Sequence, residues 1–248
     1  MKKIMLTLVV LAICVFSISA QTVDEIIGKY HQSIGGLELL KSHTSTKAFG
    51  KAPTPQGDFP FELFQEKPNK IKVSLDIMGK KMIPQAFDGQ TAWMLNPFMG
   101  DTAQKLPEDQ VKSLLDDAEL EDPFIDYAAK GHEVTLEGTE DVQGNPCFKI
   151  KLVKYKGNES RESTQYYYFD QGSFIPLMIK NSVNVGGQAD QVIETYLSDY
   201  QEVGNGMVMP FSFEVKMAGQ IVQSIIFEKI IINEDIPDEE FKFPGQAQ

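Results

Sequence analysis

The chain has 248 residues, and its 35 acidic residues against 23 basic ones give a formal net charge of -12 at pH 7. A surface this acidic repels phosphate groups, which excludes nucleic acid as a partner and argues against a standing association with anionic membranes. The length fits one large all-β or α+β domain, and no Pro-, Ser- or Gly-rich linker divides it.

The first 20 residues, MKKIMLTLVVLAICVFSISA, have the pattern of a secretory signal peptide. Two lysines precede an apolar run from Ile4 to Ile18, and small residues follow up to Ala20, after which we expect cleavage and export. The alternative is lipoprotein processing at Cys14, but Ile13 stands before it where a small residue is expected. After cleavage Cys147 is the only cysteine, so stability rests on a core, not on a disulfide.

The mature chain begins with a predicted helix. Thr22 can cap it, and residues recurring at helical spacing form its apolar face: Val23, Ile26, Ile27, Tyr30 and Ile34. Gly35 and Gly36 end this helix before a last turn from Leu37 to Leu40. From His43 to about Leu95 the period changes to two, which predicts a meander of five strands separated by turns at 53–57, 67–69, 79–80 and 88–89.

The polar interval PEDQVKSLLDDAELEDPFIDYAAKG predicts two short helices. The first begins at Pro107 with the apolar stripe Val111, Leu114 and Leu115; the second begins at Asp122-Pro123 and ends at Gly131. A second set of strands follows at Glu133 to Thr139, Cys147 to Val153, Thr164 to Phe169, Phe174 to Val183, Val192 to Tyr200, Val208 to Met217 and Ile221 to Ile232.

These elements predict a mainly β (α+β) fold of about eleven strands. Four strands contain a proline, which is typical of edges, bulges or bends: Pro60, Pro84, Pro176 and Pro210. We therefore expect an antiparallel sheet that curls without closing, with the three helices covering its concave face.

The expected concave face is large and apolar, and two interpretations of it stay open. It is either a filled sheet-on-helix core or a partly open lipid cavity, for which adaptable methionines such as Met78 and Met82 are suited. The apolar loop tip at Phe98 and Met99 would lie under the helices or form a lip. The residues predicted to line a lipid cavity are Phe59, Phe61, Leu63, Val73, Leu75, Trp93, Leu95, Phe98, Met99, Leu114, Leu115, Phe124, Ile125, Phe148, Ile150, Tyr166, Tyr168, Ile175, Leu177, Phe211 and Phe213.

The stretch QYYYFDQGSFIPLMI, residues 165–179, is a predicted hairpin with large apolar side chains on both faces. We assign Tyr166, Tyr168, Ile175 and Leu177 to the concave side. Tyr167, Phe169 and Phe174 then lie on the other face, where the phenylalanines would pack under the N-terminal helix or mark a contact surface.

No catalytic residue, metal site or cofactor is indicated. The three histidines, His31, His43 and His132, are scattered, with no metal-ligand spacing. The carboxylates between Asp116 and Asp122 are interpreted as a solvated acidic face, and Cys147 as a buried small hydrophobe.

Three stretches together resemble the LolA/LolB-like outer-membrane lipoprotein-sorting proteins, in the form common in Bacteroidetes: TVDEIIGKYHQSIGGLELLKSHTSTKAFGK, NGMVMPFSFEV and FEKIIINEDIPDEEFKFP. The resemblance implies a single domain over residues 21–248, an unclosed antiparallel barrel whose helices form a lid over a hydrophobic cavity. It also implies a monomeric, non-enzymatic periplasmic carrier. Such a carrier shields acyl chains of lipid or lipoproteins and meets membrane-bound donor and acceptor proteins.

One residue departs from this pattern. In the carriers an arginine on an early strand holds the lid, whereas the one arginine of this chain is Arg161, in the second half. Two alternatives therefore remain: a sensor or assembly module that uses the same fold to bind a protein partner, and a hydrolase that would depend on His132 or Asp126.

Overall fold

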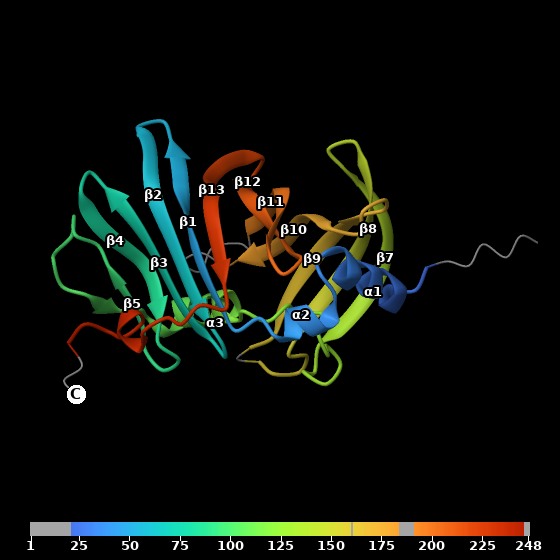
Figure 1. Ribbon diagram of the computed structural model, residues 1–248, viewed down its shortest axis with the longest axis horizontal. Coiled ribbons are helices and arrows are strands. Elements are labelled where there is room, and N and C mark those ends of the chain that lie inside the picture. Colours follow the sequence, from blue (N-terminus) through green and yellow to red (C-terminus); the bar gives the residue numbers. More distant parts are fainter. Residues whose placement is uncertain (1–20, 160, 184–190, 246–248) are drawn as a thin grey trace, which may run out of the picture.

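The computed structural model describes residues 21–159, 161–183 and 191–245 (Figure 1). The predicted signal peptide, residues 1–20, lies outside the described residues. The described chain forms one large sheet with a few short helices, which confirms the mainly β class.

The N-terminal helices form where the sequence predicts them. Thr22 precedes α1 (Val23–Ser33); its Oγ1 accepts from the Glu25 backbone N–H at 3.2 Å, while the Glu25 carboxylate accepts from the Thr22 N–H at 3.1 Å. This reciprocal capping box satisfies two otherwise unpaired backbone donors at the helix start. After the two glycines comes α2 (Leu37–Lys41). The helix α3 (Glu108–Ala118) begins directly after Pro107, also as predicted.

The prediction of a second central helix, from Asp122-Pro123 to Gly131, is wrong. Residues 123–131 form a series of turns, in which the His132 N–H donates to the Tyr127 carbonyl at 2.9 Å and the Gly131 N–H to the Ala128 carbonyl at 3.1 Å. Asp126 has φ 48°, in the left-handed region. A continuous α-helix cannot pass through this conformation, which explains why the apolar spacing there does not produce one. A short 3-10 helix (Asp238–Glu240) lies near the C-terminus.

All strands belong to one antiparallel sheet of thirteen strands, in the order β6-β5-β4-β3-β2-β1-β13-β12-β11-β10-β9-β8-β7. The strands are β1 (Ser45–Thr54), β2 (Gly57–Glu66), β3 (Lys70–Ile77), β4 (Lys80–Phe87), β5 (Ala92–Leu95), β6 (Gln104–Lys105), β7 (Glu133–Val142), β8 (Asn145–Lys154), β9 (Ser163–Asp170), β10 (Pro176–Val183), β11 (Gln191–Gly204), β12 (Met207–Met217) and β13 (Gln220–Ile232). The expected count of eleven and the expected curling are corrected: the sheet is not closed or strongly curled, and β6 and β7 are its two edges. The two-residue β6 is too short to carry a sequence pattern.

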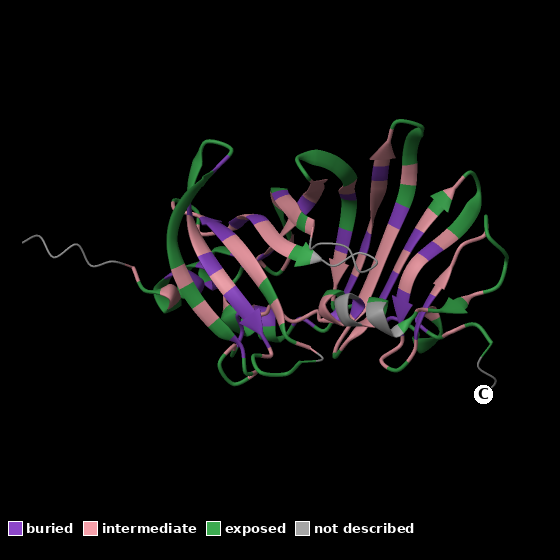
Figure 2. Cartoon of the chain, turned by 180° about the vertical axis from the view of Figure 1, so that it is seen from behind, coloured by how far each residue is buried: buried purple, intermediate pink, exposed green. Residues whose placement is uncertain are grey.

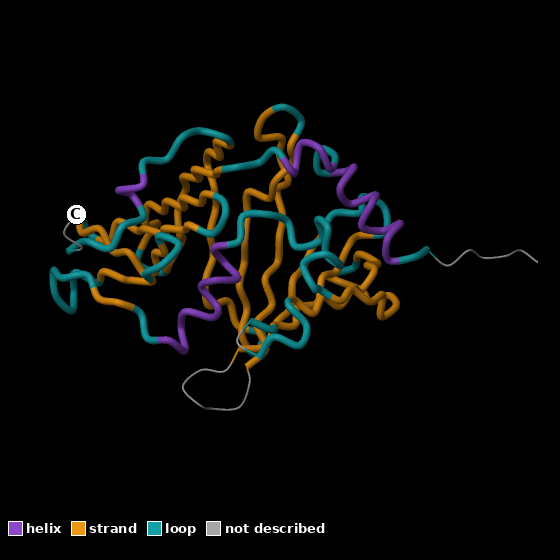
Figure 3. The backbone as a smooth tube through the Cα atoms, turned by 90° about the horizontal axis from the view of Figure 1, so that it is seen from below, coloured by secondary structure: helices purple, strands orange, loops and turns teal. Residues whose placement is uncertain are grey.

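The sheet consists of two meanders, β1 to β6 and β7 to β13, that meet where β1 pairs with β13. Because β6 and β7 follow each other in the chain but form opposite edges, residues 106–132 must pass across the sheet. We call them the crossing segment. It contains α3 and the turns at 123–131, and it runs along one face of the strands (Figures 1 and 3).

Three connected hydrophobic clusters mark the face that the helices cover. One joins α1, α2 and Phe124 to β8, β9 and β12; the next lies over β1, β2, β12 and β13; the third joins α3 to β3, β4 and β5. The clusters share partly buried side chains such as Leu63 and Met209. We call this side the helix-covered face. The hairpin ends at 55–58, 78–81 and 218–223 are exposed (Figure 2).

Two smaller clusters lie on the opposite face. One contains Tyr168, Met178 and the fully buried Cys147, which confirms that this cysteine is a core residue. Burial raises the pKa of its thiol to about 11. The other contains Trp93, whose Nε1 donates to the Phe241 carbonyl at 2.8 Å and so fastens the C-terminal segment to the sheet.

The face assignment of the 165–179 hairpin is wrong for Tyr166, Tyr168 and Leu177, whereas Ile175 does pack on the helix-covered face. Ile150 pairs with Tyr167 and Phe148 with Phe169, and residues directly opposite in an antiparallel pair share a face. Tyr167 and Phe169 therefore belong to the helix-covered face, and Tyr166 and Tyr168 to the opposite face. The expectation that Phe169 and Phe174 pack under the N-terminal helix is confirmed. The Phe169 ring lies 5.0 Å from that of Tyr30, and the Lys29 Nζ lies 4.6 Å from the centroid of Phe174.

The junction of the two meanders depends on a glycine. The β1–β13 register shifts between Phe49 and Gly50, and there the two backbones approach closely. A Cβ at Gly50 would overlap the Ile226 carbonyl oxygen and lie 2.7 Å from the Phe227 Cα, both of them backbone atoms that cannot turn aside. Only glycine fits this seam without moving a strand.

We predict that Gly50→Ala lowers the free energy of unfolding by on the order of 2–4 kcal/mol, because one methyl group forces the two meanders apart. Urea denaturation of residues 21–248 measures this change. Gly28→Ala is the matched control: Gly28 lies inside α1, and no atom lies within 4 Å of the position that an added methyl group would take, so helix propensity should stabilise that variant by roughly 0.5–1 kcal/mol. Equal stability of the Gly50→Ala variant and the parent would contradict the close approach.

Candidate ligand-binding cavity

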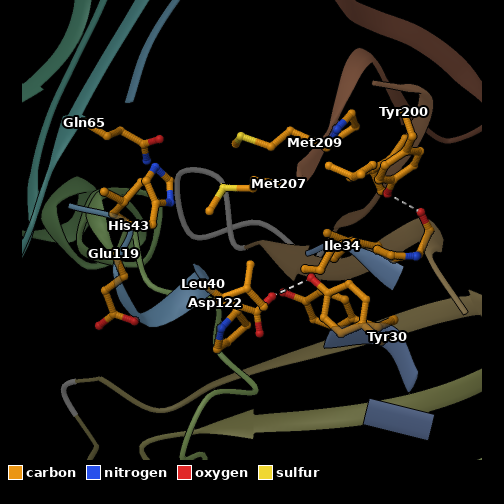
Figure 4. A pocket seen from close by; sticks show the side chains of 18 residues that line it. Tyr30, Ile34, Leu40, His43, Gln65, Glu119, Asp122, Tyr200, Met207 and Met209 are labelled. Carbon is orange, nitrogen blue, oxygen red and sulfur yellow. Dashed lines mark hydrogen bonds between the residues drawn. The ribbon is translucent and has the colours of Figure 1, made fainter. Parts of the chain in front are cut away.

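A cavity of about 280 Å³ lies between the helix-covered face, the two N-terminal helices and the crossing segment (Figure 4). Its apolar walls come from α1, α2 and strands β10 to β12: Ile34, Leu40, Ile179, Leu197, Met207 and Met209. Pro123, Pro176 and Pro210 also line it. Pro176 and Pro210 were singled out in the sequence as bends, and the β9–β10 register does shift between Pro176 and Met178.

Three tyrosines line the cavity and donate their hydroxyl hydrogens to protein atoms. Tyr30 donates to the Asp122 carboxylate at 2.5 Å, Tyr200 to the Pro176 carbonyl at 2.5 Å, and Tyr167 to the Gln165 side-chain oxygen at 2.9 Å. Burial raises the pKa of all three well above the ordinary value, so the hydroxyls stay protonated at any physiological pH.

Four further polar residues line the cavity: His43, Gln65, Glu119 and Asp122. The His43 Nε2 lies 3.0 Å from the Ser45 carbonyl oxygen and 2.8 Å from the Thr46 Oγ1, and burial lowers the histidine pKa. The Gln65 Nε2 donates to the Asp117 carbonyl at 2.8 Å. Gln65 comes from the first meander and the apolar wall mostly from the second, so the cavity exists only where both meanders meet.

Ion pairs fasten the crossing segment to the second meander. The Lys154 Nζ, on β8, lies 2.8 Å from both an Asp116 oxygen and a Glu119 oxygen, and its side chain is only 4% exposed. Arg161 pairs with the same Glu119, and the Ser163 hydroxyl donates to Asp116 at 2.7 Å. The interpretation of Asp116 and Glu119 as part of a solvated acidic face is therefore wrong, because both carboxylates neutralise buried or half-buried cations.

The carboxylate that faces the first meander is paired as well. Glu121 lies 3.3 Å from the Lys67 Nζ and 2.6 Å from the Lys130 Nζ. These lysines, together with their hydrogen bonds, hold the pKa of Glu121 below its usual range although partial burial opposes the shift. The crossing segment is thus tied to the sheet on both sides of the cavity.

None of the residues predicted to line a lipid cavity is among those lining this one. Most pack into the clusters of the helix-covered face: Phe61, Leu63, Val73, Leu75, Leu114, Leu115, Phe124, Ile125, Phe148, Ile150, Ile175, Phe211 and Phe213. Others lie on the opposite face: Trp93, Leu95, Tyr166, Tyr168 and Leu177. Phe59 is partly buried on β2, whereas Phe98 and Met99 are exposed in the loop after β5.

The cavity residues that sequence reasoning missed are the polar ones and the methionines of β12. No local pattern marks Gln65 or Glu119, because the two are brought together only by the crossing of the chain. A usable signal was the run MVMP at 207–210, where flexible methionines adjoin a strand proline. Neither His132 nor Asp126, on which a hydrolase would depend, lines the cavity.

Within the described ranges, no group of three or more His, Cys, Asp or Glu side chains is arranged to hold a metal ion. The helices of that same part of the chain are all too short or too polar to span a membrane.

Comparison with known proteins identifies the fold. No protein-family model and no curated protein sequence matches the chain. A domain named for outer-membrane lipoprotein sorting, from Vibrio parahaemolyticus, superposes with a TM-score of 0.54 at 10% identity, over 88% of this chain and 95% of that one. A LolA superfamily protein from Nitrosomonas europaea gives 0.57 at 13% identity, over 90% and 98%.

A protein of the DUF1329 family from Desulfovibrio piger also gives a TM-score of 0.57, at 12% identity, over 90% of this chain and 98% of that one. The likeness confirms the resemblance noted in the sequence at the level of the fold. Identities this low establish architecture and leave activity to be argued from the site itself.

The electrostatics of the crossing segment predict a loss of stability in mild acid. His132 is buried, its Nδ1 accepts from the Tyr155 N–H at 3.0 Å, and its Nε2 has no hydrogen-bond partner in the described structure. Burial, with Lys154 and Lys130 nearby, lowers its pKa to about 4. Below about pH 6.5, the ordinary pKa of histidine, His132 binds a proton in the unfolded chain but stays neutral in the folded chain until the pH approaches about 4.

We therefore predict that the free energy of unfolding falls as the pH drops from about 6.5 to about 4, by at most about 1.4 kcal/mol per pH unit for this group. Urea denaturation at about pH 7 and about pH 5 measures the loss. His132→Gln should reduce the slope; a part remains, because the pKa of His43 is also lowered by burial. An unchanged slope in the variant would assign the loss to other groups.

Proposed function

We propose that this chain is a periplasmic carrier that shields an acyl chain of a lipid or lipoprotein in the cavity beneath its crossing segment. The observation that carries the proposal is the cavity itself, a partly open space bordered by helices on one side and by an apolar strand wall on the other. The fold shared with a domain named for outer-membrane lipoprotein sorting and with a LolA superfamily protein supports it. Residues 21–248 act as one domain, and carriage requires no catalytic residue.

The volume sets the size of the cargo. A methylene group is close in size to a water molecule, which takes up roughly 30 Å³ of liquid, so about 280 Å³ receives an acyl segment of about ten carbons. Burying ten methylenes is worth on the order of 8 kcal/mol relative to water, as an upper bound. A bilayer offers nearly the same gain, so loading and release are close to balanced, as a carrier needs. A longer or multiple chain requires the lid to open.

The crossing segment, with α1 and α2, acts as the lid. Apolar contacts of α3 and Phe124 hold it on the sheet, and beside the cavity its position is fixed by ion pairs of Lys154 and Arg161 with Glu119. Arg161 thereby lies at the lid although it is not on an early strand. Membrane-bound donor and acceptor proteins would open the lid by competing for these contacts.

A second candidate function is a sensor or assembly module that binds a protein partner. It is favoured by one observation: in the loop after β5, Phe98 is 54% exposed and Met99 is 79% exposed, so two large apolar side chains face solvent side by side. Loss of a partner complex in the Phe98→Ser, Met99→Ser variant, with no lipid retained by the parent, would favour this function over carriage.

We predict that residues 21–248, purified from cells and examined by native mass spectrometry, retain a lipid. Met209→Trp should lower the retained fraction at least about tenfold, because a larger side chain occupies the cavity that Met209 lines; such a drop corresponds to about 1.4 kcal/mol. Met99→Trp is the matched control, since Met99 is exposed and far in sequence from the wall residues. Equal retention by Met209→Trp and the parent would place the lipid elsewhere, and a parent free of lipid would refute the proposal.

A further inference from the structure

The polar side chains that line the cavity offer mainly hydrogen-bond acceptors. The His43 Nε2 approaches the Ser45 carbonyl oxygen at 3.0 Å, which requires that this nitrogen carries the hydrogen. In a neutral imidazole the other ring nitrogen, Nδ1, then holds a lone pair and can only accept. Burial lowers the pKa of His43, so the neutral ring is the form present at pH 7.

Gln65 and the two carboxylates present acceptors as well. The Gln65 Nε2 gives one of its two hydrogens to the Asp117 carbonyl at 2.8 Å, so the side chain keeps its carbonyl oxygen as an acceptor and one N–H as a donor. Glu119 and Asp122 are acceptor-only when ionised, and their oxygens already accept from protein groups, Glu119 from Lys154 and Arg161 and Asp122 from Tyr30. Figure 4 shows Gln65, His43 and Glu119 on one side of the cavity, Tyr30, Ile34 and Tyr200 on the other, and Met207 and Met209 between them.

Positive charge is missing from the lining that the structure describes, and side-chain donors are few. The hydroxyls of Tyr30, Tyr167 and Tyr200 already donate to protein oxygens. Pro123, Pro176 and Pro210 have no backbone N–H to offer. In the part of the chain that the structure describes, no lysine or arginine lines the cavity, and the cations that pair with Glu119 are not among the lining residues.

We propose that the cavity selects a single-chain amphiphile whose head donates hydrogen bonds and carries no negative charge, such as a long-chain alcohol, amide or amine, and rejects fatty-acid and phosphate anions. The head lies at His43, Gln65 and Glu119, and the tail lies along Met207 and Met209. This inference rests on the proposed carriage of acyl chains and names the class of cargo.

The physical reason is the cost of an unpaired group. A hydroxyl or N–H at the head can donate to the Gln65 carbonyl oxygen or to the His43 Nδ1. A carboxylate or phosphate would be desolvated with no cation in the described lining and only the remaining Gln65 N–H as a side-chain donor, beside two carboxylates of the same sign, which disfavours its binding. The charge of the head group and its capacity to donate hydrogen bonds therefore both favour neutral donor heads over anions.

Competition with a neutral reporter tests the selectivity. Nile red bound to residues 21–248 is displaced by decan-1-ol, decanamide, decylamine, methyl decanoate or decanoate, each below its aggregation concentration and at about pH 8, where decanoate is ionised. We expect decan-1-ol and decanamide to bind at least about tenfold more tightly than decanoate, which equals about 1.4 kcal/mol. Methyl decanoate, neutral but without a donor, should be weaker than decanamide, which separates donor capacity from charge.

A variant reverses the preference. Gln65→Lys places a donor and a positive charge at the head end and should tighten decanoate binding at least about tenfold. Gln85→Lys is the matched control, because Gln85 does not line the cavity and makes only a long contact, 3.5 Å, to Asp117. Decanoate binding to the parent as tightly as decan-1-ol, or no response to Gln65→Lys, overturns the selectivity alone. Failure of every decyl compound to displace Nile red, with no lipid retained, overturns the carrier function together with it.

Discussion

The structure depends on one topological constraint: two strands that follow each other in the chain, β6 and β7, form opposite edges of the sheet. The chain between them has to travel across the strands, and it takes the helix-covered face, where α3 and Phe124 bury apolar side chains against the sheet. The cavity lies beside the part of the segment between these two apolar contacts, where Glu119, Leu120, Asp122 and Pro123 line it.

Buried charge decides where the crossing segment rests. Lys154 is almost fully buried, and an unpaired lysine there would cost several kcal/mol, so Asp116 and Glu119 must lie beside it. Hydrophobic contacts alone would allow the segment to slide along an apolar face. The ion pairs add little net stability for their number, but they fix the position of the segment and so the dimensions of the space beneath it.

Much of the fold could be predicted from the sequence because its signals are local. The capping residue Thr22 and the proline at the start of α3 each act within one element, and both predictions are confirmed. Register is not local: whether Tyr167 or Tyr168 faces the helices depends on its pairing with β8, which no periodicity within the hairpin reveals. The left-handed residue Asp126 and the meeting of Gln65 with Glu119 escaped prediction for the same reason.

The pairing of β1 with β13 also has a consequence for the order in which the sheet folds. Each meander can form by neighbouring hairpins, a fast process with short loops, whereas β1 and β13 are separated by nearly the whole chain. Their pairing carries the largest loop-closure entropy in the sheet and therefore comes late in folding. Because the cavity takes its walls from both meanders, it is complete only once this pairing has formed. Formation of the cavity is thus coupled to the last long-range step by which the chain becomes native.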